Sequence, residues 1–485
     1  MKKKPTVLPL LIDDQHPLPV TRRDFLSRGL AGVSTYFMAP TALGLILREN
    51  QARADGCPAS GANPSLLPFL VFDLVGGAAL SGNFVPLDRG GNPLPSYSLL
   101  GMGDSTNFPK LSVNTSFGAP MAGPGPLAAP AMGGGVAQTS KLLEGLISKT
   151  SLAAQANLRM GVICHNSQSD TANNQHSAIQ QVAMAGAQGS VLRGGLGMVN
   201  VMSGANSDVP FSDSTLKPLA LKSIADLTGA LSYGPALSSL SDQALKSIAR
   251  ATAKLSNEQG IALSRRSLGQ QFATLVSCGL IKNIDYTTPV QGLDSRQDAI
   301  FRNAYGINPG TNPSDLLAVT STIAMNVIKG NTGPGAIMLG GYDYHDSTQT
   351  TGDGRDFLAG QQIGMAVQAA FDSGKSLVFQ VLTDGGLASA DGTRNWKDDS
   401  NEKGLTVVGV IRPQGAASMR KTQLGSFTAG QGADTTSLFG VDTKLVALSV
   451  FANYLSLSGK INLFESVVTG SSLSSTNLDQ VLMFG

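Results

Sequence analysis

Four short apolar segments of this chain each run directly into glycine and polar residues, and this repeated pattern constrains the fold most strongly. The segments are 67–74, 158–164, 336–339 and 376–382. Uninterrupted apolar runs of this length are typical of strands buried on both faces, as in a parallel sheet. Segments with apolar residues at helical spacing alternate with them, at 177–187, 216–231, 241–280, 315–329, 356–371 and 444–457. The alternation predicts an α/β fold with a largely parallel central sheet and helices on both faces.

Composition excludes several other classes of protein. Of the 485 residues, 42% are apolar and 14% are charged, whereas typical globular chains have about 25% charged residues. The low charge argues against a disordered chain, a coiled coil and a nucleic-acid-binding protein. We expect one α/β domain over residues 55–485, with a Gly/Pro-rich surface excursion at 101–135 and a helical insertion at 215–280.

The first 54 residues have the features of an export signal. Residues 2–4 are lysines, the motif RRDFL stands at 22–26, and residues 29–47 carry no charge. Paired arginines before a weakly apolar stretch resemble the signal read by the twin-arginine export machinery. Residues 52–54 (ARA) fit the small-residue cleavage rule, so we expect a mature chain that starts at Asp55 and is periplasmic or secreted. The alternative is an uncleaved membrane anchor, since about 20 apolar residues span a bilayer.

The mature chain carries little net charge. Residues 1–54 hold eight of the 35 Lys and Arg residues and four of the 33 Asp and Glu residues, so 27 basic and 29 acidic residues remain. This balance offers no basic surface to a nucleic acid. The chain contains no phosphate-binding loop and no dinucleotide fingerprint, so we expect no nucleotide cofactor.

Three cysteines remain after cleavage, at Cys57, Cys164 and Cys278. An oxidising compartment allows one disulfide among them, and the sequence does not select the pair. The alternative is that Cys164 and Cys278 are buried as small apolar side chains.

Candidate metal ligands stand at or near the ends of predicted strands. Asp343 and His345 follow the run 336–339, and Asp73 and Asp384 stand at the ends of two other runs. Parallel strands bring their carboxyl ends to one edge of a sheet, where ligands bind. Carboxylate oxygen and imidazole nitrogen are ligands for divalent ions, and the candidate ions are zinc, manganese, magnesium and calcium. The alternative for His345 is a structural role in which it bridges loops.

His176 and Ser177 are candidate catalytic residues. Ser177 opens the predicted helix 177–187, and a serine beside a histidine can act as a nucleophile with the imidazole as its base. The alternative is that Ser177 caps the helix, which is the ordinary role of serine at that position.

Several short motifs together resemble a known bacterial family. They are RRDFL at 22–26, FDLVGG at 72–77, GGYDYH at 340–345 and TDGG at 383–386. This combination resembles the exported family known as domain of unknown function 1501, which is related to the alkaline phosphatase and sulfatase superfamily. The resemblance implies an alkaline phosphatase-like fold with a metal-dependent hydrolase site. In it, Asp343 and His345 match the family's Gly-Gly-Trp-Asp-x-His segment, and His176 and Asp384 fall in two further family segments.

Two family positions are altered in this chain. The family has a carboxylate soon after its paired glycines, whereas residues 76–82 read GGAALSG, so Asp73 would have to substitute. The later Asp-His-Gly segment has no histidine here, and Asp398 or Asp399 supplies only the acid. Two functions follow from these observations. The first is an exported metal-dependent hydrolase of small phosphate or sulfate esters, and the second is a catalytically degenerate member that acts as a periplasmic binding or envelope-assembly protein.

Overall fold

The computed structural model describes the chain in a series of stretches. They are residues 66–102, 113–114, 116–119, 121–122, 140–167, 176–186, 196–198, 219–231, 243–244, 247, 290–345, 348–383, 385–389, 392–399, 403–439, 442, 444–468, 473–474 and 477–485. The predicted signal at 1–54, most of the predicted insertion at 215–280, and Cys57, Cys278 and Asp384 lie outside the described residues.

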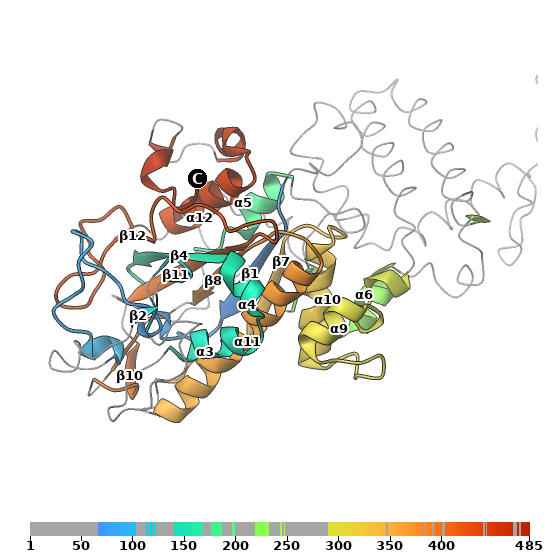
Figure 1. The fold of residues 1–485 in the computed structure, drawn as a ribbon, viewed down its shortest axis with the longest axis horizontal. Coiled ribbons are helices and arrows are strands. Elements are labelled where there is room, and N and C mark those ends of the chain that lie inside the picture. Colours follow the sequence, from blue (N-terminus) through green and yellow to red (C-terminus); the bar gives the residue numbers. More distant parts are fainter. Residues whose placement is uncertain are drawn as a thin grey trace, which may run out of the picture.

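An eight-stranded sheet forms the centre of the fold (Figure 1). In spatial order its strands are β12 (Gln423–Leu424), β4 (Leu158–His165), β11 (Gly404–Ile411), β8 (Leu377–Thr383), β1 (Phe69–Leu74), β7 (Gly335–Leu339), β5 (Leu196–Gly197) and β6 (Leu219–Ala220). β11 is antiparallel to both of its neighbours, and the other pairings are parallel. The four predicted strands are β1, β4, β7 and β8. They run in one direction, so the prediction of a largely parallel sheet is confirmed.

Helices cover both faces of this sheet, as predicted. One face is covered by α3 (Lys141–Ser148), α9 (Ala299–Tyr305), α10 (Leu316–Ile328) and α11 (Gln349–Asp372), and the other by α5 (Ile179–Met184), α12 (Lys444–Leu457) and α13 (Phe464–Val467). Within the described residues no helix is long and apolar enough to cross a membrane.

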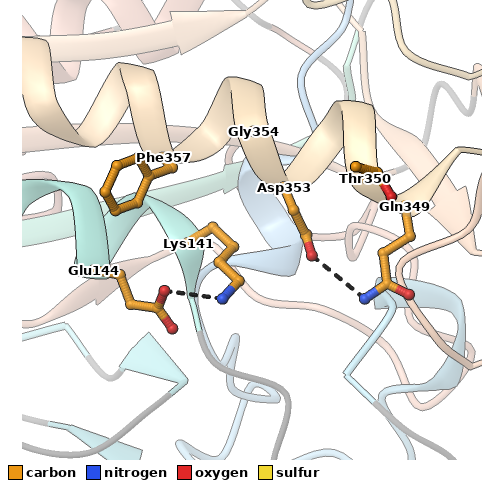
Figure 2. A pocket seen from close by; sticks show the side chains of 7 residues that line it. All are labelled: Lys141, Glu144, Gln349, Thr350, Asp353, Gly354 and Phe357. Carbon is orange, nitrogen blue, oxygen red and sulfur yellow. Dashed lines mark hydrogen bonds and ion pairs between the residues drawn. The ribbon is translucent and has the colours of Figure 1, made fainter.

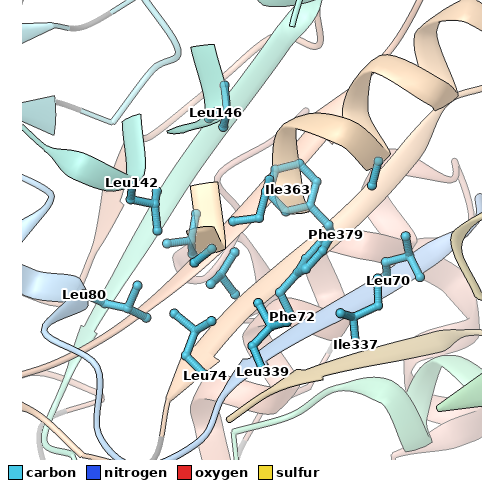
Figure 3. Packing of buried hydrophobic residues seen from close by; sticks show 14 of the residues in the cluster. Leu70, Phe72, Leu74, Leu80, Leu142, Leu146, Ile337, Leu339, Ile363 and Phe379 are labelled. Carbon is cyan, nitrogen blue, oxygen red and sulfur yellow. The ribbon is translucent and has the colours of Figure 1, made fainter. Parts of the chain in front are cut away.

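Successive side chains of β1 point to opposite faces of the sheet. Leu70, Phe72 and Leu74 pack with the α11 side of the core (Figure 3), and Phe69 and Val71 pack with the α12 side. Because β1 is buried on both faces, the run 67–74 is apolar without alternation.

The predicted helices agree with the structure best where the helix is buried along most of its length. α12 coincides with the predicted 444–457, and α10 lies within the predicted 315–329. α11 begins at Gln349, well before the predicted start at 356, because its first turns contain Gly352 and Gly354 and few apolar side chains. α5 covers only part of the predicted 177–187. α4 (Leu152–Asn157) and α6 (Ile224–Leu231) are the remaining described helices of six residues or more.

Part of the predicted surface excursion at 101–135 is buried. Phe117 and Ala119 are fully covered, and the Ala119 N–H donates to the carbonyl oxygen of Met160 in β4 at 2.8 Å. These residues satisfy main-chain groups along β4, which explains their inward position. Beyond them, β2 (Val113–Asn114) and β3 (Met121–Ala122) form a two-stranded sheet.

α3 and α11 approach each other closely through glycines. A Cβ on Gly360 would lie 2.0 Å from the carbonyl oxygen of Leu142, and one on Gly145 would lie 2.1 Å from that of Phe357. A side chain at either position would therefore push the two helices apart. The contact holds the first turns of α3 beside the middle of α11, around Phe357 and Gly360.

Candidate functional site

The carboxyl ends of β4, β8, β1 and β7 lie along one edge of the sheet, and the predicted site residues stand at these ends or in the segments next to them. Asp73 is the second-last residue of β1 and is buried. His176 and Ser177 precede α5, and Asp343 and His345 follow β7. The remaining candidate, residue 384, lies outside the described residues, directly after the last residue of β8.

Hydrogen bonds join the ends of β8, β1 and β7. Thr383 Oγ1 donates to the carbonyl oxygen of Leu74 at 2.8 Å and accepts from the Ala78 N–H at 2.7 Å. The Val75 main chain donates to Leu339 and accepts from Tyr342, both at 3.0 Å. The turn after β1 is therefore fixed between the β8 end and the β7 loop.

A close backbone contact places Asp343 against this turn. Gly76 has a φ of +114°, and a Cβ there would lie 2.5 Å from the backbone nitrogen of Asp343. Only glycine fits both the dihedral and the space. This requirement accounts for the first glycine of the FDLVGG motif.

His176 is fully buried and held by β8. Its Nε2 lies 2.8 Å from the carbonyl oxygen of Thr383. A carbonyl oxygen only accepts, so Nε2 carries the hydrogen, and in the neutral ring the lone pair resides on Nδ1. Gln380 in β8 holds the adjacent backbone, because its Nε2 donates to the carbonyl oxygen of His176 at 2.6 Å and its Oε1 accepts from the Ala178 N–H at 3.0 Å. The imidazole therefore has one fixed orientation.

His165 has a structural role at the end of β4. Its ring lies 4.9 Å from the His176 ring, centroid to centroid. Its Nδ1 donates to the carbonyl oxygen of Asn166 at 3.0 Å, so its Nε2 accepts from Thr406 Oγ1 at 3.1 Å. Burial, and after it the neighbouring His176, lower the pKa of His165 from 6.5 to about 3. Both ring nitrogens are satisfied in the neutral form.

Cys164, the residue before His165, is buried as a small side chain, which was the alternative to a disulfide in the sequence analysis. It is fully buried and forms no disulfide, and burial raises the pKa of its thiol above the ordinary value. A thiol held in its protonated form by burial is chemically inert.

The structure does not support a capping role for Ser177. The residue at the N-cap of α5 is Ala178, which makes no side-chain cap hydrogen bond. The prediction of Ser177 as N-cap is therefore wrong: the helix begins one residue later than that cap requires, and Gln380 rather than a serine side chain accepts the Ala178 N–H. Ser177 Oγ is covered, and it has no hydrogen-bond partner among the described residues.

The Asp343 carboxylate and the His345 imidazole are paired on the rim of the site. His345 Nδ1 contacts Asp343 Oδ1, and the two side chains are 44% and 47% exposed. A carboxylate on Nδ1 fixes the hydrogen there and leaves the Nε2 lone pair directed away from the pair. The two residues differ from the buried His176 in being open to solvent.

Two tyrosines that alternate with Asp343 and His345 anchor the rim to α11. Tyr342 and Tyr344 are buried, and their hydroxyls donate to the carbonyl oxygen of Arg355 at 2.8 Å and to Asp356 Oδ1 at 2.6 Å. Residues alternate along this extended loop, so Asp343 and His345 face outward when the tyrosines face inward.

A buried ionic network that the sequence did not reveal supports this anchor. Arg394 is 1% exposed and contacts both Asp353 and Asp356, and it also donates to the carbonyl oxygen of Gly82 at 3.0 Å. Asn83 donates to Asp356 at 2.8 Å. Burial raises the pKa of Asp356, and the Arg394 charge opposes that shift. No local pattern marks the network, because its members are far apart along the chain.

The network also joins a β-hairpin to α11. Arg394 precedes β10 (Trp396–Asp399), which pairs with β9 (Leu387–Ser389). Its guanidinium lies 5.4 Å from the centre of the Trp396 ring, and Trp396 is fully buried against Gly82, Gly101 and Gly352. The lone tryptophan is therefore part of the core rather than of the solvated acidic loop that its neighbours suggest.

The described residues contain no group of three histidine, cysteine, aspartate or glutamate side chains arranged to hold a metal ion. The Asp343–His345 pair supplies oxygen and nitrogen donors of the kind that zinc and manganese accept. The pair therefore fits a divalent ion in donor type, and further ligands would have to come from other side chains or water.

Comparisons of this chain with family models, curated proteins and solved structures find no match.

Proposed function

We propose that this protein is an exported hydrolase-like protein that binds a divalent cation through His345 and acts on phosphate or sulfate esters at the carboxyl edge of the sheet. The observation that carries the proposal is the Asp343–His345 pair. It joins a half-exposed imidazole to an orienting carboxylate at the edge where open α/β sheets bind ligands.

In this proposal Asp343 orients the ring and His345 Nε2 binds the ion. A carboxylate that accepts from the other ring nitrogen fixes the tautomer and raises the basicity of the ligand, and such partners are worth about 10–100-fold in metal affinity. A bound divalent ion supplies Lewis acidity that polarises an ester oxygen.

His176 is the candidate base for the same edge. Its Nε2–H is fixed on Thr383, so any proton it takes must go to Nδ1. The Gln380 clamp fixes the backbone that carries the ring. Ser177 is the adjacent candidate nucleophile, and its use requires its covered Oγ to become accessible.

A second function, a non-catalytic binding or envelope protein, is favoured by a different observation. His165 and His176 are 1% and 0% exposed, and both rings are engaged with the backbone. Two of the three histidines downstream of the predicted signal therefore contribute to packing. In this alternative the carboxyl edge of the sheet keeps the geometry of a hydrolase site, but the protein does not catalyse a reaction.

Activity measurements separate the two functions. Purified mature protein is assayed with p-nitrophenyl phosphate and p-nitrophenyl sulfate after loading with zinc, manganese, magnesium or calcium in turn. The hydrolase proposal expects turnover with at least one ion, lost in His345→Ala and kept in Asp372→Asn, an exposed change at the far end of α11. Turnover that is absent with every ion, or equal in His345→Ala, favours the binding function.

A further inference from the structure

A pocket of about 440 Å³ lies between the first turns of α3 and α11. Its size falls within the range of about 300–1,000 Å³ that is typical of small-molecule sites. Figure 2 shows Lys141 and Glu144 reaching in from α3, and Gln349 and Asp353 from α11. None of these residues belongs to the Asp343–His345 pair.

Charged groups in the pocket are matched in pairs. Lys141 Nζ lies 2.9 Å from Glu144 Oε2. Asp353 contacts the buried Arg394 through Oδ1 and accepts from Gln349 Nε2 at 3.3 Å through Oδ2. The charges of the two pairs therefore cancel, and a ligand with a net charge gains little net attraction from the pocket.

The same groups keep spare hydrogen-bonding capacity. An ammonium has three donors and a carboxylate has about four acceptor positions, so the ion pair by itself does not exhaust the hydrogen-bonding capacity of Lys141 or Glu144. Thr350 adds a hydroxyl. A ligand that carries many neutral hydroxyl groups can use both kinds of site at once.

One wall of the pocket is apolar. Phe357 and the bare backbone of Gly354 line it beside the polar groups. A sugar ring has hydroxyls around its rim and C–H groups on its faces, so it matches a pocket with an aromatic ring and a polar border.

The polar border is held in place before any ligand binds. Asp353 is fixed by Arg394, which is itself 1% exposed and bound to Asp356 and Gly82. Lys141 stands at the first position of α3, whose cap Ser140 bonds to Asn83 at 2.9 Å. Pre-organised groups lose less entropy on binding.

We propose that this pocket binds a neutral, polyhydroxylated ligand, namely a monosaccharide or short oligosaccharide. The inference is independent of the proposed hydrolase site, since it rests on charge balance and on the geometry of α3 and α11.

The test is binding of matched sugars to the mature protein by saturation-transfer NMR and calorimetry. The probes are glucose and N-acetylglucosamine as neutral ligands, glucosamine as a cation and glucuronate as an anion. We expect the neutral sugars to bind most tightly. Glu144→Gln removes an acceptor and leaves Lys141 unpaired, so it should weaken neutral sugars by about tenfold and improve glucuronate.

The matched control is Asp372→Asn on the far end of α11, which should bind all four probes as the wild type does. The proposal is overturned if no neutral sugar binds, if a charged sugar binds wild type more tightly than its neutral counterpart, or if Glu144→Gln leaves the order of affinities unchanged. Circular dichroism and thermal unfolding of each variant show whether a loss of binding reflects a loss of fold.

Discussion

The Gln380 side chain, in the middle of β8, holds the backbone on both sides of Ser177: it donates to the carbonyl oxygen of His176 at 2.6 Å and accepts from the Ala178 N–H at 3.0 Å. This two-point clamp lies inside the core, since Gln380 is fully buried. Together with the hydrogen bond from His176 Nε2 to the Thr383 carbonyl oxygen, it holds the loop before α5 on the central sheet.

Gln380→Leu should destabilise the protein strongly. The change leaves two buried backbone groups without partners, and each such group costs about 1–3 kcal/mol. We expect a loss of about 2–5 kcal/mol in the free energy of unfolding, measured by urea denaturation. Gln297→Leu, at an exposed position, is the control and should change stability by less than about 0.5 kcal/mol. Equal effects of the two changes would contradict the clamp.

Stability should fall as the pH falls from neutrality, in part because of His165. Its pKa is about 3 in the folded protein and 6.5 when unfolded, so between these values the unfolded chain binds the extra proton. The free energy of unfolding is unaffected by the titration of His165 above pH 6.5. As the pH falls below 6.5, His165 lowers it by up to about 1.4 kcal/mol per pH unit.

The measurement compares urea unfolding at pH 7, 6 and 5 in wild type and His165→Gln. The variant should show a flatter dependence on pH, whereas Gln297→Leu, an exposed change that involves no titratable group, should retain the wild-type slope. A slope unchanged in His165→Gln would show that other groups cause the acid sensitivity.

Replacing the serine that precedes α3 with alanine should lower stability, whereas the same change in the serine before α5 should not. Ser140 Oγ accepts from the Leu143 N–H at 3.0 Å and donates to Asn83 at 2.9 Å, so Ser140→Ala should cost about 1–3 kcal/mol. Ser177 Oγ is covered and has no hydrogen-bond partner within the described stretches. Ser177→Ala should therefore leave thermal stability unchanged or slightly raised, and a cost equal to that of Ser140→Ala would refute this assignment.

The Arg394–Asp356 pair should show strong coupling in a double-mutant cycle. Removing one partner of a buried ion pair costs about 3–5 kcal/mol, because the other charge stays buried. Arg394→Met should therefore be more destabilising than the double change Arg394→Met with Asp356→Asn. Unfolding free energies that simply add would contradict a direct interaction.

The sequence predicted the parts of the fold that depend on local pattern. The strands β1, β4, β7 and β8 and the helices α10 and α12 follow from apolar runs and helical spacing. β11 was not predicted, because its apolar run is broken by Thr406 and Gly409. Gly409 has a specific cause: a Cβ there would lie 2.0 Å from the Phe379 ring of the adjacent strand. That contact depends on strand order, which no local pattern contains.

The candidate site was predictable in position and not in detail. The edge itself follows from the polar residues after each apolar run. The roles of His165 and His176 depend on Thr406, Thr383 and Gln380, which lie more than 200 positions away along the chain. For the same reason the sequence did not reveal that Gln380 binds the backbone just before α5.

Asp343 should act on metal affinity through His345. Asp343→Asn keeps the size of the side chain and removes the charge that fixes Nδ1–H, so we expect divalent-ion affinity to fall by about 10–100-fold. The folded state should be unaffected, because both side chains are about half exposed. Thermal unfolding with and without added zinc measures both quantities, and a zinc-dependent stabilisation equal to that of wild type would exclude the orienting role.

The most direct test of the account is a calorimetric titration of metal-free mature protein with zinc and manganese, in wild type and in His345→Ala. The account predicts saturable binding of at least one ion by wild type, and loss of that binding in the variant with the same far-ultraviolet circular dichroism. Wild-type protein that binds neither ion, or His345→Ala protein that binds as tightly as wild type, would contradict it.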